Sequence, residues 1–268
     1  MKRTPLSKTI HVGSVKSLAV LSDLHLRDPN ETNTKLATEE ILALAGTELV
    51  VFLGDIFDFI FIGSKFFQKR WENFISACKS LQKSGTKIAF IEGNHDFGFE
   101  HHFPQDLHSA FTYVGDCILQ CTHPTLGEIS LRHGDDIVCP ENYLIFRNTI
   151  KNKNFQKAAS LLPGIAMHLI FSNWAKISRS QDSYRYLSPE FFVECVRNKI
   201  SSDTQSPNIL ILGHVHENID TIIRKMRCLA GPSWLTAPSI LTCNATGEFQ
   251  RIFVGGKDVP LFALPKSE

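Results

Sequence analysis

The sequence predicts an α/β protein with a helical block inserted into its second half. Three observations favour this class. Short apolar runs of strand length recur along the chain, helical stretches separate the first of them, and a helical pattern from about 143 to 200 interrupts the series. Strands that alternate with helices are typical of α/β chains. With 268 residues, 43% of them hydrophobic, the chain has enough apolar material for one large or two small domains.

In chain order, the first half consists of strands followed by helices. Strands are expected at 17–21, 49–53 and 87–91, and helices at 34–45 and 66–84. The second helix carries apolar residues at three- and four-residue spacing, as an amphipathic helix does. The helical block is expected to break at 163–164 and again around 178–189. The other strands are expected at 112–114, 118–121, 129–132, 208–212, 219–223, 234–235, 239–243 and 250–254.

Composition excludes several classes of protein. Charged residues make up 21% of the chain and the net charge is +1, which argues against global disorder. Seven cysteines without a Cys-x-x-Cys pair argue against a disulfide scaffold and fit a reducing compartment. The most apolar stretch, 161–175, is too short and too interrupted to span a bilayer, and the basic N-terminus lacks a signal-peptide core. We therefore expect a soluble, cytoplasmic protein.

The basic residues are unevenly distributed. Between Arg147 and Arg179 stand six Lys and Arg residues and no Asp or Glu. The rest of the chain is net acidic. A basic stretch in a nearly neutral protein is expected to contact something anionic.

Five of the expected strands end in polar clusters. Carboxyl ends of strands are where sites form in α/β sheets, so these side chains could meet at one edge. The clusters are Asp23 with His25, Asp55, Asn94 with His95 and Asp96, His133, and His214 with His216. Oxygen and imidazole donors without thiolates suit Mn²⁺, Fe²⁺, Zn²⁺ or Mg²⁺, and disfavour a structural zinc site.

These clusters form ordered motifs, which are Asp23-Leu24-His25, Gly54-Asp55-Ile56-Phe57-Asp58, Gly93-Asn94-His95-Asp96, His133-Gly134-Asp135 and Gly213-His214-Val215-His216. In order and interval the set resembles the calcineurin-like metallophosphoesterase superfamily. The resemblance implies a four-layer sandwich, in which two packed mixed β-sheets are flanked by helices. The core would comprise 1–140 and 201–268, with a helical lid inserted at 141–200.

The resemblance also implies a site for two divalent cations, with Mn²⁺ expected first and Fe²⁺, Zn²⁺ or Mg²⁺ as alternatives. Two such ions can activate a water and hold a phosphate during in-line displacement. His95 would protonate the leaving oxygen or stabilise the transition state, with Asp96 orienting its ring. In the implied ligand set, Asp23, His25 and His216 hold the first ion, Asn94, His133 and His214 hold the second, and Asp55 bridges both.

The lid resembles that of the UDP-2,3-diacylglucosamine pyrophosphohydrolases of lipid A biosynthesis, in which Tyr-x-x-Phe-Arg follows His-Gly-Asp. This likeness implies hydrolysis of UDP-2,3-diacylglucosamine to UMP and 2,3-diacylglucosamine 1-phosphate, close to the inner membrane surface. The implied partner is an anionic, lipid-linked nucleotide, and neither a nucleic acid nor a protein partner is implied. The expected substrate-binding residues are Tyr143, Phe146, Arg147, Lys151, Lys157, Trp174 and Ser180.

Two other interpretations stay open. The chain departs from the lipid A enzymes at His95, where they usually carry Arg, and before Tyr143, where only Glu141 is acidic. A metallophosphoesterase of other specificity, such as a general phosphodiesterase, a phosphatase or a nuclease, would share the metal site. A nuclease should also show a basic track toward the metals, and the chain outside the lid is net acidic. A non-catalytic scaffold should have lost a ligand, and every expected position is filled.

Overall fold

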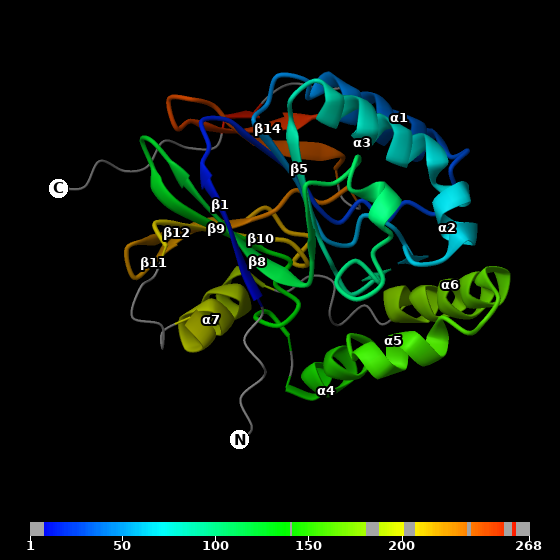
Figure 1. Cartoon of the computed structure of the whole chain (residues 1–268). Helices are drawn as coiled ribbons and strands as arrows, with labels where there is room; N and C mark the ends of the chain where they lie inside the picture. Colours follow the sequence, from blue (N-terminus) through cyan, green and yellow to red (C-terminus); the bar gives the residue numbers. More distant parts are fainter. Residues whose placement is uncertain are drawn as a thin grey trace.

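Two mixed β-sheets pack face to face, with helices on their outer faces (Figure 1). The computed structural model describes residues 8–139, 141–180, 188–200, 207–234, 237–254 and 259–260. The first sheet has the order β15-β14-β13-β2-β3-β5-β7. Its strands are β2 (Leu18–Leu21), β3 (Leu49–Leu53), β5 (Lys87–Ile91), β7 (Tyr113–Gly115), β13 (Ser239–Cys243), β14 (Phe249–Phe253) and β15 (Val259–Pro260).

The second sheet has the order β1-β8-β9-β10-β12-β11. Its strands are β1 (Lys8–Ser14), β8 (Cys117–His123), β9 (Gly127–Arg132), β10 (Ile209–Leu212), β11 (Asp220–Ile223) and β12 (Met226–Ala230). A two-stranded sheet pairs β4 (Ile60–Phe61) with β6 (Asp96–Phe97). The strands β2, β3 and β5 run parallel to one another, as do β9, β10 and β12.

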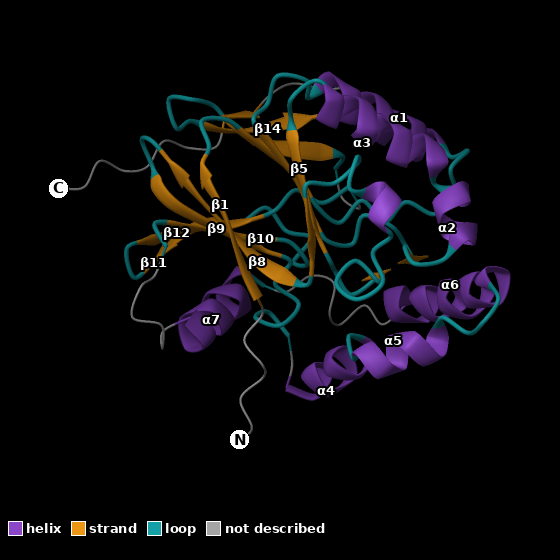
Figure 2. Cartoon of the chain, viewed as in Figure 1, coloured by secondary structure: helices purple, strands orange, loops and turns teal. Residues whose placement is uncertain are grey.

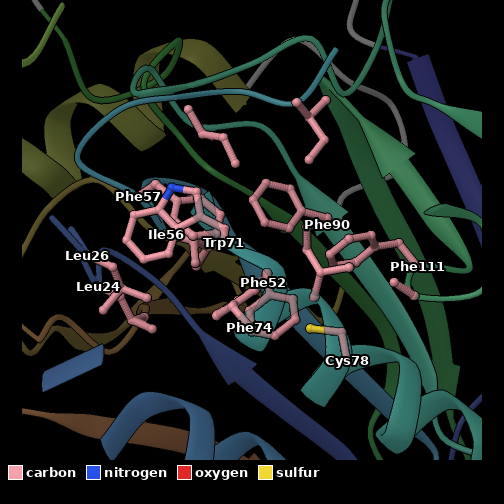
Figure 3. Packing of buried hydrophobic residues seen from close by; sticks show 14 of the residues in the cluster. Leu24, Leu26, Phe52, Ile56, Phe57, Trp71, Phe74, Cys78, Phe90 and Phe111 are labelled. Carbon is pink, nitrogen blue, oxygen red and sulfur yellow. The ribbon is translucent and has the colours of Figure 1, made fainter. Parts of the chain in front are cut away.

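The central strands are apolar on both faces because both faces are covered. In β3, Leu49, Val51 and Leu53 point between the two sheets. Val50 and Phe52 point the other way, toward α1 (Thr32–Ala43) and α3 (Glu72–Lys83). This alternation turns a uniformly apolar run into two layers of core. Aromatic rings fill the layer under the helices, where the ring centroids of Phe52 and Phe74 lie 5.4 Å apart (Figure 3).

On the second sheet, α7 (Pro189–Ile200) forms the outer layer. Phe192 and Val196 of α7 are buried in one cluster with Leu210 and Leu212 of β10. The order helix, sheet, sheet, helix is the predicted four-layer sandwich, which is confirmed (Figure 2). Although α7 falls within the predicted lid, it packs on the sheet as a layer of the core.

Three further helices of the predicted lid lie away from the sheets, namely α4 (Glu141–Ile150), α5 (Lys153–Ala159) and α6 (Gly164–Ser180) (Figure 1). Helix α6 rests on the core through the buried Met167 and through Phe171, whose ring stacks on Phe59 with 4.5 Å between centroids. Gly164 begins α6 where the chain passes so close to Phe66 that a Cβ atom would overlap its side chain.

Several elements differ from the sequence prediction. The helix expected at 66–84 is two helices, α2 (Lys65–Arg70) and α3, because Trp71 leaves the helical region at φ −105° and ψ 23°. The Trp71 ring packs instead against Phe57, 4.6 Å away. Trp234 lies in a turn and not in the strand expected at 234–235, and Leu235 lies outside the described residues. Strands β1 and β12 were not predicted.

Candidate metal centre

Five loops at the carboxyl ends of β2, β3, β5, β9 and β10 meet at one edge of the sandwich. Their backbones are tied together directly: the Asp23 N–H donates to the Gly54 carbonyl and the His25 N–H to the Asp55 carbonyl, both at 3.0 Å. The His214 N–H donates to the Asp23 carboxylate at 3.0 Å. Side chains separated by up to 193 residues in the sequence therefore share one site.

Glycine permits this convergence at two positions. A Cβ atom on Gly54 would overlap the His133 ring and lie 2.8 Å from the Gly93 Cα atom. A Cβ atom on Gly93 would overlap Asp55. These glycines therefore precede Asp55 and Asn94 because the loops that carry the two side chains pass in direct contact.

The backbone is strained where the polar side chains stand. Positive φ angles occur at Asp23, His25, Asp55, His214 and His216, between 48° and 68°. For residues other than glycine this conformation is unfavourable by about 1–3 kcal/mol each, and it persists where the surrounding structure enforces it. Five such residues in one site indicate that the rest of the fold stabilises a locally unfavourable backbone, which directs these side chains into the site.

The structure brings the predicted ligands into two groups. In the first, Asp23, His25 and His216 have ligand atoms within 4.8 Å of one another, and His216 Nε2 lies 3.0 Å from Asp23 Oδ1. In the second, Asp55, His133 and His214 likewise have ligand atoms within 4.8 Å of one another.

Asp55 and Asn94 complete this arrangement. Asp55 Oδ2 lies 3.9 Å from His25 Nε2 and 3.6 Å from His133 Nε2, so it stands between the groups as a bridging carboxylate would. Asn94 Oδ1 lies 3.3 Å from His133 Nε2, on the side of the second group. The structure thus brings the predicted ligands together. His95, which is not among the predicted ligands, also lies within 4.8 Å of ligand atoms of His25 and Asp55.

A family model described as calcineurin-like phosphoesterase matches residues 16–218, the stretch that contains all five loops. The chain belongs to the calcineurin-like phosphoesterase family. Members of this family use a dimetal centre, and the two groups of side chains are candidate ligands for such a centre here.

The chain is also similar in sequence to two curated proteins. The chain is 24% identical to UDP-2,3-diacylglucosamine hydrolase of Vibrio vulnificus over 241 residues, which is 85% of this chain and 93% of the relative. It is 28% identical to the enzyme of the same name from Stutzerimonas stutzeri over 138 residues, half of this chain and 55% of the relative. Among solved structures, a dimetal phosphatase from Danio rerio matches with a TM-score of 0.45 and 13% identity, covering 91% of this chain and 98% of that one.

The residues of the phosphoesterase centre fit a pair of cations. Both ring nitrogens of His25 are buried and have no hydrogen-bond partner among the described residues. An imidazole packed among carboxylates would be a costly arrangement if no ligand engaged its nitrogens. Two ions held by Asp23, His25 and His216, by Asn94, His133 and His214, and by Asp55 between them would polarise a phosphate and activate water.

The electrostatics prepare two of the histidines, His25 and His214, to act as ligands. Burial lowers the pKa of His25 to about 3, although Asp55 opposes it, and burial together with nearby His133 lowers the pKa of His214 to about 4. Burial would also lower the pKa of His133, but the Asp55 carboxylate outweighs it and raises that pKa to about 10. At neutral pH His25 and His214 are therefore uncharged, with nitrogen lone pairs available to a cation.

His95 lies at the same centre, with its ring centroid 5.1 Å from that of His25. Its Nδ1 is 2.8 Å from the carbonyl oxygen of Asp58. Asp96 was predicted to orient this ring, but its carboxylate instead accepts hydrogen bonds from the backbone N–H groups of Ile56, Phe57 and Gly93 at 3.2–3.4 Å. The ring is thus oriented by a main-chain carbonyl, while Asp96 holds the Asp55 loop against the Asn94 loop.

Asp58 is a functional position to which the sequence analysis assigned no role. Its carboxylate Oδ1 lies 3.7 Å from His25 Nδ1, and its carbonyl contacts His95. Asp58 is therefore placed to influence two histidines of the centre. Its position three residues after Asp55, in Gly54-Asp55-Ile56-Phe57-Asp58, was the available signal.

The predicted substrate-binding residues differ in their surroundings: some lie near the centre or on the surface, two are buried in ion pairs, and two have side chains that the structure does not describe. Tyr143 lies beside His214, 6.0 Å between ring centroids, and packs against Phe146, while Lys157 is exposed on α5. Arg147 and Lys151 are buried and bonded to core acceptors, so their cations face the protein and not a substrate groove. Trp174 and Ser180 belong to α6, but their side chains lie outside the described residues.

Proposed function

We propose that this phosphoesterase hydrolyses the diphosphate of UDP-2,3-diacylglucosamine, releasing UMP and 2,3-diacylglucosamine 1-phosphate. The curated relatives named for this substrate support the proposal, and one structural observation carries it. The dimetal-type centre, which suits a diphosphate, stands beside helices that display an unusual amount of apolar surface. A substrate with an anionic headgroup and two acyl chains needs both.

The apolar surface is concentrated on helices α4, α5 and α6 and on the turn between α5 and α6. Seven of the nine exposed large apolar side chains in the described part of the chain belong to residues 145–170. They are Ile145, Phe155, Leu161, Leu162, Ile165, Leu169 and Ile170, with exposed fractions from 39% to 84%. Soluble proteins seldom display such a concentration unless it binds something. Acyl chains are the occupant that the proposed substrate supplies.

Tyr143 links this surface to the centre. Its hydroxyl is buried and has no hydrogen-bond partner among the described residues, although the ring lies against His214. Burial raises the pKa of Tyr143 well above its usual value, with nearby Asp135 and Asp55 adding to the effect. The hydroxyl therefore keeps its proton and can donate it in a hydrogen bond to an anionic oxygen. This supports a role for Tyr143 in binding the substrate headgroup.

Hydrolysis of three substrates by the purified chain with Mn²⁺ tests the proposal. The substrates are UDP-2,3-diacylglucosamine, UDP-N-acetylglucosamine, which carries the diphosphate without the two long acyl chains, and bis-p-nitrophenyl phosphate. We expect UMP and the lipid 1-phosphate from the first at a kcat/KM far above that of the second, because binding of the acyl chains contributes to transition-state stabilisation. Equal rates on the first two, or cleavage of the generic diester only, would favour a phosphodiesterase of other specificity.

The same apolar surface supports a second part of the proposal, contact with a membrane surface. None of the described helices is long and apolar enough to cross a bilayer. The turn after α5 and the first turn of α6 instead combine the exposed Leu161 and Ile165 with the exposed Lys157 of α5. Apolar side chains flanked by cations are typical of helices that lie in the interface of an anionic membrane.

Replacing Leu161 and Ile165 together by Glu is expected to weaken sedimentation with phosphatidylglycerol vesicles by roughly tenfold or more, because each buried apolar side chain contributes about 1.5–3 kcal/mol. Ile222→Glu is the matched control. Ile222 is 51% exposed and belongs to β11 of the second sheet, outside the lid helices. Equal losses from both changes, or a wild-type chain that stays in the supernatant, would contradict the membrane contact.

A further inference from the structure

Helix α4 touches the metal centre at three points along one stripe. Tyr143 and Arg147 belong to α4, and Lys151 is the first residue after it. The three are spaced by four residues, so they project from the same side. Each of the three contacts a different loop of the centre. The loops are those of His214, His133 and Asn94, which are the three histidine and asparagine ligands expected for the second ion.

Lys151 fixes the Asn94 loop. Its Nζ donates to Glu92 Oε2 at 2.9 Å, to the Gly93 carbonyl at 2.6 Å and to the Asp96 carbonyl at 3.4 Å. These three residues bracket Asn94 and His95. Glu92 is itself held, because its Oε1 accepts from the backbone N–H groups of Phe99 and Glu100. The three donor positions of the ammonium group are thus taken up by the loop.

Arg147 fixes the His133 loop in a similar way. Its Nε donates to Asp135 Oδ2 at 2.8 Å, and its Nη2 donates to Asp116 Oδ1 at 2.7 Å. Asp135 follows His133 by two residues, and Asp116 lies between β7 and β8. Both Arg147 and Asp135 are buried. One guanidinium therefore joins the lid helix, the His133 loop and the edge of the sandwich.

From these contacts we infer that Arg147 and Lys151 are positioning residues: they hold the His133 and Asn94 loops so that the second ion's ligands converge. Among the described residues, the ligands expected for the first ion, Asp23, His25 and His216, form no hydrogen bond or ion pair with Arg147 or Lys151. The effect of the two side chains should therefore fall on the second ion. This inference deepens the proposed function, because it concerns the same centre, but it does not depend on the lipid substrate.

The test is a titration of the metal-free chain with Mn²⁺ alone, followed by electron paramagnetic resonance, for Lys151→Met and Arg147→Met. Removing a group that supports a metal ligand typically weakens metal affinity or activity about 10–100-fold. We expect that loss for one of the two ions, the one whose binding Asn94→Ala also weakens, with the other ion bound as in the wild type. Asn94→Ala provides the reference for a weakened second site, and thermal melting confirms that each variant is folded.

Lys65→Met is the matched control, since Lys65 pairs with Asp106 at 3.5 Å on the exposed surface. If Lys151→Met fails to fold because Glu92 is left buried and unpaired, Glu92→Gln with Lys151→Met removes both charges and allows the same titration. Equal weakening of both ions in folded variants, or no change in either, would overturn the inference.

Turnover of bis-p-nitrophenyl phosphate separates this inference from the proposed substrate. For positioning residues, kcat should fall about 10–100-fold with the loss of the second ion, in line with the effect of other groups that orient ligands. A rise in KM for the lipid substrate alone, with Mn²⁺ binding intact, would make Lys151 a substrate-binding residue instead. If the wild-type chain does not hydrolyse UDP-2,3-diacylglucosamine but the variants lose only the second ion, the proposed substrate is wrong and the positioning role stands.

Discussion

Asp55→Asn is expected to eliminate phosphoester hydrolysis, with a larger loss than the roughly 10²–10³-fold that follows removal of a single oxyanion-hole donor. Among the described residues, Asp55 is the carboxylate that lies between both groups of expected ligands, 3.9 Å from His25 Nε2 and 3.6 Å from His133 Nε2. Burial alone would raise its pKa, but the surrounding histidines, His133 first, hold the pKa well below the usual value. The carboxylate is therefore charged, and its charge would offset the repulsion between two cations held by the two groups.

Asparagine preserves the shape of the side chain and removes its charge, so the substitution tests the charge itself. The Oδ1 position can still accept from the His95 N–H, a contact of 2.8 Å in the structure. Steady-state hydrolysis and Mn²⁺ stoichiometry should both be measured, and we expect fewer than two ions per chain. Asp106→Asn, an exposed carboxylate outside the centre, is the control. An Asp55→Asn variant that binds two ions and retains activity would exclude a bridging role.

The metal ligands could be predicted from the sequence because each one directly follows an apolar run. Asp23 and His25 follow β2, Asp55 follows β3, and Asn94 follows β5, so strand ends alone place them at one edge. Parallel pairing of these strands brings the ends together. The backbone strain at Asp23 and Asp55 leaves no trace in composition or periodicity, and it is visible only in the structure.

The roles of Arg147 and Lys151 could not be predicted for a different reason. Their partners Asp116 and Glu92 lie 31 and 59 residues away in the sequence, so no local pattern reveals the pairing. A cation in a basic, helical stretch indicates equally well an exposed face, a phosphate contact or a buried ion pair. Strand β1 was missed because most of its residues are exposed at the sheet edge, so it lacks an apolar pattern.

His95→Gln is expected to slow hydrolysis by about 10²–10⁴-fold when the leaving group is an aliphatic alcohol, the range for a lost general acid. The geometry defines which nitrogen acts. A carbonyl oxygen can only accept, so the contact between His95 Nδ1 and the Asp58 carbonyl at 2.8 Å requires the proton on Nδ1. Nε2 is then the atom that can give a proton to the departing oxygen, from the imidazolium form in which both ring nitrogens carry a proton.

The leaving group distinguishes acid catalysis from a structural role. p-Nitrophenolate departs without needing a proton, so His95→Gln should slow cleavage of a p-nitrophenyl diester much less than cleavage of an alkyl diester. His95 is not among the ligands expected for either ion, although one of its ring nitrogens lies within 4.8 Å of ligand atoms of His25 and Asp55. We therefore expect Mn²⁺ binding close to that of the wild type, and its loss would make His95 a ligand instead. Asp58→Asn is an informative companion, since it keeps the main-chain carbonyl that holds the His95 ring. A uniform loss on both diesters would assign His95 to transition-state stabilisation or to support of the centre, and not to proton transfer.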